Sequence, residues 1–121
     1  MNLETKKPKA RNLEETLYQA HADICGTLSN EKRLRIIDFL SKGELSFGEL
    51  STKLGIKRPN LAQHLFILKE RGIIEVRRQG KNTFYRISDS RVIEACQLMR
   101  EVLMDQIRKK QFLLKLKEGK L

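Results

Sequence analysis

The stretch from residue 57 to residue 72, KRPNLAQHLFILKERG, constrains the fold of this chain more than any other. Leu61, Leu65 and Leu68 recur at helical spacing and predict a single buried stripe. Pro59 suits the first helical position, because the N–H that proline lacks would have no helical partner there. Gly72 supplies a C-terminal stop. The pattern predicts one helix with a core face and a polar face.

The polar face of this helix carries side chains that suit the major groove of DNA. Asn60 and Gln63 point away from the leucine stripe, and Arg58 stands at the helix entrance. Arginine pairs well with guanine there, and asparagine or glutamine pairs with adenine. We therefore predict a DNA recognition helix, with an ordinary solvated surface helix as the alternative.

The residues before this helix complete a recognisable arrangement. Ser46 and Glu49 fit a capping box, which begins a short helix with Leu50 and Leu54 facing inward. Gly55 ends that helix, and only Ile56 and Lys57 lead from it into the next helix. Two helices joined by a tight glycine-containing turn, the second with polar side chains outward, predict a helix-turn-helix.

Three further helices and a hairpin surround this unit. We expect helices over 12–28 and 31–43, the second capped by Ser29 or Asn30, and a last helix capped by Ser88 or Asp89. The second helix should turn Leu34, Ile37, Phe39 and Leu40 inward. The apolar stripes of the other two helices are Leu13, Leu17, Ala20, Ile24 and Leu28 in the first and Val92, Cys96, Met99, Leu103 and Ile107 in the last. We expect the last helix to continue past Arg108.

Residues 73–78 and 83–87 predict two strands joined by a turn over 79–82. The hairpin carries Arg77, Arg78 and Lys81 near its tip. The fold class is therefore α+β, mainly α. A purely solvated hairpin is the alternative to a functional one, and the single sign of the charge at the tip argues against it.

The net charge of +10 is unevenly distributed. Residues 57–81 carry seven basic and two acidic side chains, and residues 106–121 carry six and one. A clustered basic footprint favours a polyanion partner, here double-stranded DNA, over a merely solubilising surface. No apolar run approaches the roughly 18 residues of a membrane span, and the N-terminus lacks the apolar core of a secretory signal. We expect a cytoplasmic, nucleoid-associated protein without membrane contact.

Three segments in this order resemble the bacterial and archaeal arsenic-repressor/zinc-sensor (ArsR/SmtB) family: LSNEKRLRII over 28–37, LGIKRPNLAQHL over 54–65 and GKNTFY over 80–85. The resemblance covers roughly residues 20–105. It implies a winged helix-turn-helix homodimer that binds inverted-repeat operators and usually represses transcription. The hairpin would be the wing, and the first and last helices would form the dimer interface. The interface residues would be Leu13, Leu17, Ile24, Met99, Leu103 and Ile107.

The resemblance also implies roles for individual residues. Recognition positions map onto Lys57, Arg58, Asn60, Ala62 and Gln63. Family members often have Ser or Thr at 57, 60 and 62, so the DNA sequence read here should differ. His64 matches a family histidine, for which packing or a phosphate contact is expected rather than metal binding. Phe66 either contacts a thymine methyl group or packs on a neighbouring subunit, and we favour packing.

The wing cations Arg77, Arg78 and Lys81 would lie along phosphates or enter the minor groove. With one domain of 121 residues, we expect a flexible basic arm over 1–10, a DNA-binding and dimerisation domain over 11–108 and a basic tail over 109–121. The tail would either add non-specific affinity for DNA or serve only solubility.

The sequence departs from the family at both metal sites that can be mapped. The thiolate site would fall within 44–50, ELSFGEL, which has no cysteine. The zinc site would use Asp89, Arg91, Val102 and Asp105, and neither arginine nor valine is a zinc ligand of that kind. We therefore predict no metal and no cofactor, and the sequence does not name an effector.

Two cysteines, Cys25 and Cys96, are too few for a disulfide framework. If the first and last helices pack together, these thiols could form a redox switch, as in thiol-sensing relatives of the family. The alternative is that both are small core residues.

An enzyme is not expected, because the two histidines have no companion nucleophile in a known motif and no glycine-rich phosphate loop is present. The predicted function is sequence-specific transcriptional regulation. The main alternative is a non-specific chromatin-like or RNA-binding winged helix. A winged helix that binds only protein is disfavoured by the basic hairpin.

Overall fold

The structure, a computed structural model, describes residues 12–119. The predicted basic arm over 1–10 and the last two residues lie outside that range. The elements in chain order are α1 (Leu13–Leu28), α2 (Glu31–Leu40), β1 (Leu45–Ser46), α3 (Phe47–Leu54), α4 (Arg58–Glu70), β2 (Ile74–Gln79), β3 (Asn82–Ile87) and α5 (Ser90–Lys117). The predicted mainly helical α+β fold with a β wing is confirmed.

The core lies where α2, α3, α4 and the sheet meet. Leu61, Leu65 and Leu68 are buried, as their spacing predicts. The core consists of these three leucines with Ile36, Ile37, Leu40, Leu50, Ile73 and Ile74. The prediction that Leu34 faces inward is wrong, because its side chain is 44% exposed and Ile36 is buried instead. The run LRII offers two helical stripes, and packing against the other elements selects the one that contains both isoleucines.

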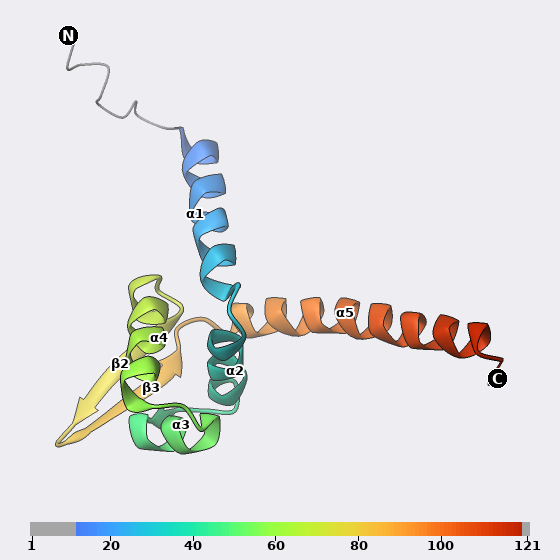
Figure 1. Cartoon of the computed structure of the whole chain (residues 1–121). Coiled ribbons are helices and arrows are strands. Elements are labelled where there is room, and N and C mark those ends of the chain that lie inside the picture. The colour runs from blue at the N-terminus through green and yellow to red at the C-terminus, as the bar shows by residue number, and fades with distance from the viewer. Residues whose placement is uncertain (1–11, 120–121) are drawn as a thin grey trace, which may run out of the picture.

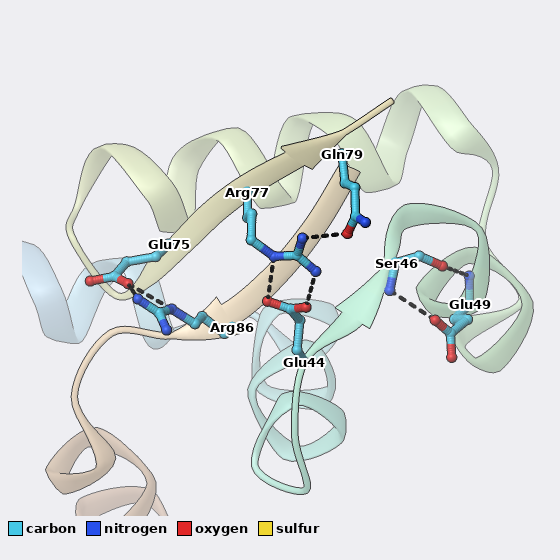
Figure 2. Close-up of polar contacts among 7 residues, drawn as sticks. All are labelled: Glu44, Ser46, Glu49, Glu75, Arg77, Gln79 and Arg86. Carbon is cyan, nitrogen blue, oxygen red and sulfur yellow. Dashed lines mark hydrogen bonds and ion pairs between the residues drawn. The ribbon is translucent and has the colours of Figure 1, made fainter. Parts of the chain in front are cut away.

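Local signals set the helix ends. The Asn30 side chain accepts a hydrogen bond from the backbone N–H of Arg33 at 3.1 Å and caps α2. The predicted capping box is present, since Ser46 Oγ and the Glu49 carboxylate each accept a backbone N–H at 3.1 Å (Figure 2). Pro59 is the second helical residue of α4 rather than the first, because the helix begins at Arg58. Both positions precede the first intrahelical donor, so the proline causes no loss there.

The sheet has the order β1-β3-β2 and is antiparallel throughout. The hairpin of β2 and β3 is the predicted wing. The strand β1 was not predicted, because two residues are too short to show an alternating pattern. It pairs Leu45 with Tyr85 and Ser46 with Phe84, and so joins the start of α3 to the wing.

The helices α1 and α5 extend away from this core in different directions (Figure 1). Only their core-proximal ends are packed: Ile24 and Leu28 of α1, and Val92 and Cys96 of α5, contact the core cluster. Two long ion pairs of 3.5 Å link the helices to the body, Asp23 with Arg71 and Arg100 with Asp38. The continuation of α5 past Arg108 is confirmed. Between residues 12 and 119, no helix combines the length and apolar character that crossing a membrane requires.

Candidate nucleic-acid interface

The helix-turn-helix is formed by α3 and α4, with Gly55 in the turn between them. Gly55 has φ +63°, a left-handed conformation that side chains disfavour. Leucines from both helices anchor the unit in the core. The predicted recognition residues all have exposed side chains at the N-terminal half of α4: Lys57, Arg58, Asn60, Ala62 and Gln63. All five side chains are therefore accessible to solvent.

The side chain of Arg58 is held by an aromatic ring. Its guanidinium carbon lies 4.6 Å from the ring centroid of Phe47, the first residue of α3. The Phe47 ring in turn lies 6.5 Å from that of Tyr85 on β3. Cation–π contact restrains the arginine while its N–H groups remain able to donate. These contacts connect α4 to the wing.

His64 lies on the side of α4 that faces α2. It is half-buried, and its Nδ1 atom has no hydrogen-bond partner among residues 12–119. Burial lowers the pKa of His64, and the positive charges of Arg33 and Lys32 lower it further. The ring is therefore neutral at neutral pH, which supports packing over phosphate attraction, although both roles remain predictions. The Nε atom of Arg33 is likewise buried without a partner in the described chain.

Phe66 lies on the outer surface of α4 with 61% of its area exposed. Most of its surface is therefore left uncovered by its own subunit. The two predictions for it, a thymine methyl group or another subunit, both remain open to experiment.

The three wing cations occupy different environments, although the sequence presents them as equivalent. The Arg77 guanidinium donates from Nη2 to Glu44 Oε1 at 2.6 Å and from Nε to Glu44 Oε2 at 3.3 Å (Figure 2). Its Nη1 donates to the Gln79 side-chain oxygen at 2.6 Å, and its carbon lies 4.6 Å from the Phe84 ring centroid. The hydrogen bond from Arg77 lowers the pKa of Glu44, and the same bond raises the pKa of Arg77. Arg77 is thus occupied by protein contacts.

Arg78 and Lys81 are exposed and have no ion pair among residues 12–119. Successive strand residues point to opposite faces, so Arg78 lies on the other face of the hairpin from Arg77. Consistent with this, Arg78 is close to Tyr85, where its charge opposes the rise in pKa that burial causes for that phenol. Arg78 and Lys81 are therefore the wing cations that remain available to an anionic partner.

The positions mapped to the family zinc site have another role here. Asp89 accepts the backbone N–H of Arg91 at 2.9 Å and so caps α5, and it forms an ion pair of 2.7 Å with the Arg91 guanidinium. These hydrogen bonds lower the pKa of Asp89 to about 2. Within residues 12–119, no three side chains of the metal-binding types lie close enough together to hold an ion.

The two cysteines are free thiols in different surroundings. Cys25 is exposed on α1, whereas Cys96 is half-buried at the base of α5 and contacts the core cluster. Burial raises the pKa of the Cys96 thiol, which reduces its thiolate fraction and its reactivity. Its placement supports the core role, and redox sensing remains a prediction.

The sequence did not single out Glu44. Its partner Arg77 is 33 residues away, and no local pattern links two such positions. The bridge of β1 to the wing would mark this position, but a strand of two residues is too short to predict from the sequence.

Together, the helix-turn-helix, the three-stranded sheet and the exposed basic surface define a winged helix-turn-helix DNA-binding protein. The family model described as "Bacterial regulatory protein, arsR family" matches residues 30–76. This chain belongs to the arsR family, and it is a DNA-binding transcriptional regulator.

Individual relatives agree with this assignment. The biofilm growth-associated repressor of Agrobacterium fabrum is 44% identical over 77 residues, which span 61% of this chain and 66% of the relative. The repressor of the same name from Xylella fastidiosa strain 9a5c is 36% identical over 94 residues, which span 78% and 82%. A homodimeric winged helix-turn-helix DNA-binding domain from Mycobacterium bovis has a TM-score of 0.75 at 26% identity, covering 85% of this chain and 95% of that one.

Proposed function

We propose that this protein is a transcriptional repressor that binds an inverted-repeat operator as a homodimer. The observation that carries the proposal is the row of exposed polar side chains on α4, anchored from behind by buried leucines. Arg58, Asn60 and Gln63 contact base edges in the major groove, where their donor and acceptor groups distinguish base pairs. Lys57 adds charge at the helix entrance.

The wing contributes affinity rather than base reading. Arg78 and Lys81 contact phosphates beside the major groove, which orients the protein on the duplex without selecting a sequence. Each phosphate neutralised by such a cation adds about 0.9 to the slope of log K against log salt. Arg77 is excluded from this role in the proposal, because Glu44 already neutralises it.

The dimer is proposed from the apolar surface of α1 and α5. Leu13, Leu17, Met99, Leu103 and Ile107 are between 47% and 84% exposed in the single subunit. Apolar patches of this kind mark interaction surfaces, and a second copy covers them in a two-fold dimer. Such a dimer presents two α4 helices to half-sites about 34–36 Å apart. The solved M. bovis domain is described as homodimeric.

The proposed repressor does not use metal at the two family sites, since Asp89 is engaged with Arg91 and residues 44–50 contain no cysteine. A thiol response through Cys25 and Cys96 is the remaining candidate for its effector. It is tested by operator affinity under diamide and under reductant, in wild type and in Cys96→Ser. Equal operator affinity in all four conditions would show that both cysteines are purely structural.

The function itself is tested by comparing duplexes at one salt concentration. The DNA upstream of the protein's own gene, random duplex and a duplex with one half-site scrambled are titrated with the full-length protein. We expect a preference of roughly 10³ or more for the intact site over random duplex, reduced by scrambling. Equal affinity for every duplex would support a chromatin-like binder instead, and tighter binding to RNA would support an RNA-binding winged helix.

A further inference from the structure

The contact between Glu44 and Arg77 connects opposite edges of the sheet. Glu44 precedes β1, and Arg77 belongs to β2, while β3 lies between these strands. The ion pair therefore crosses the face of β3 (Figure 2). The Arg77 guanidinium carbon lies 4.6 Å from the ring centroid of Phe84 on that strand. Carboxylate and guanidinium meet through two hydrogen bonds, the geometry that restrains both groups most.

The pair joins the helical body to the wing beyond the start of β2, where Ile74 is buried in the core. The edge strand β1 contributes two residue pairs, both with β3. Among residues 12–119, two ion pairs involve the outer strand β2. The pair of Arg77 with Glu44 joins β2 to the loop after α2, whereas the pair of Glu75 with Arg86 links β2 to β3. Ile74 anchors the start of β2 in the core, so loss of the Glu44 contact would free the outer part of this strand, from Arg77 on, to twist relative to α4.

We propose that Glu44 is a positioning residue for DNA binding: by holding Arg77, it fixes the outer strand so that Arg78 and Lys81 face the DNA phosphates. The adjacent residues Arg77 and Arg78 point to opposite faces of the strand, so restraining one orients the other. The inference rests on the proposed function, because it assigns the wing a role in operator binding.

The proposal predicts that Glu44→Gln weakens operator binding, whereas simple electrostatics predicts that it strengthens binding. Removing an acidic side chain normally strengthens binding to a polyanion. If Glu44 merely competed with phosphate for Arg77, Glu44→Gln would strengthen operator binding and raise the salt slope by about one. If Glu44 positions the wing, the same substitution weakens binding and lowers the salt slope, because the Arg78 contact is lost.

The experiment compares full-length wild type with Glu44→Gln and with Glu75→Gln as a matched control. Both substitutions remove one negative charge from an exposed ion pair on the same sheet, but the Glu75 pair lies within the hairpin. Operator affinity is measured between about 0.05 and 0.3 M salt. We expect Glu44→Gln to lose affinity by about tenfold near 0.1 M salt, the equivalent of one phosphate contact. Glu75→Gln should bind as wild type or slightly more tightly.

Two further variants examine the mechanism. In the Arg78→Ala background, Glu44→Gln should cause little additional loss, because the contact it supports is already absent. The charge exchange Glu44→Arg with Arg77→Glu should recover part of the affinity. All variants should unfold at similar temperatures, because exposed ion pairs contribute little to stability.

A readout without DNA separates this inference from the proposed function. Backbone amides of β2 should exchange hydrogen faster in Glu44→Gln than in wild type or Glu75→Gln. Unchanged exchange, or operator affinity equal to or above that of the control, would overturn the positioning role. If wild type shows no preference for its operator, the proposed function fails while the exchange experiment still decides whether Glu44 restrains the wing.

Discussion

Gln63 is the residue for which base reading is easiest to isolate, because its side chain is exposed and no described contact holds it. Gln63→Ala should cost about 1–3 kcal/mol of operator binding and relax the preference for one base pair in each half-site. Binding to a library of single-base operator variants measures both effects. Gln111→Ala, the same change on exposed α5, serves as the control. An unchanged base preference would show that the reading face lies elsewhere on α4.

Arg78 should behave in the opposite way. Arg78→Ala should weaken binding to operator and random duplex alike and lower the salt slope by about one unit, because a phosphate contact carries no sequence information. Fluorescence anisotropy at several salt concentrations measures the slope. Arg86→Ala removes an equal charge from the same hairpin, where Arg86 is paired with Glu75, and should change the slope less. A selective loss at the operator alone would contradict a phosphate role.

At the scale of the element, the N-terminus of α5 depends on the charge of Asp89. Its pKa is lowered from 3.8 to about 2 by the bonds with Arg91. A carboxylate with a depressed folded-state pKa contributes stability that is present above its unfolded pKa. That contribution should therefore be complete above about pH 4 and should disappear as the pH falls towards about 2.

Asp89→Asn tests this expectation while keeping a residue that caps helices well. Circular dichroism melts between pH 5 and pH 2 should show wild type above the variant in Tm at pH 5, with the difference narrowing towards pH 2. Asp105→Asn, on the same helix and without an ion pair in the described chain, should show no such narrowing. A difference between wild type and Asp89→Asn that is constant across this range would exclude the ion pair as its source.

The elements show which local signals can be trusted. The capping box at Ser46 and Glu49, the glycine turn and the leucine spacing of α4 are each properties of a few neighbouring residues, and all were predicted. Leu34 was misassigned because α2 has two adjacent apolar stripes, and β1 was missed because two residues define no period. In both cases, contacts with other elements determine the outcome: they decide which stripe of α2 is buried and whether residues 45–46 form a strand.

At the scale of the whole molecule, the proposed dimer depends on the exposed stripe of α5. Leu103→Asp would place an unpaired carboxylate in that interface, which should weaken the dimer by about 3 kcal/mol or more. Light scattering over a dilution series measures the dissociation. Gln97→Glu adds the same charge on another side of α5 and should leave the dimer intact. Persistence of the Leu103→Asp dimer at wild-type strength would remove α5 from the interface.

The sequence by itself determined the helix-turn-helix, the hairpin and the exposed polar face of α4, because spacing, caps and turn residues act over distances of a few positions. It also placed Arg77, Arg78 and Lys81 on one hairpin, but as equals. Only the tertiary structure distinguished them, because the carboxylate that engages Arg77 comes from a loop 33 residues earlier and is brought there by the β1–β3 pairing. Which of the wing cations stays available to an anionic partner is thus a property of the assembled sheet.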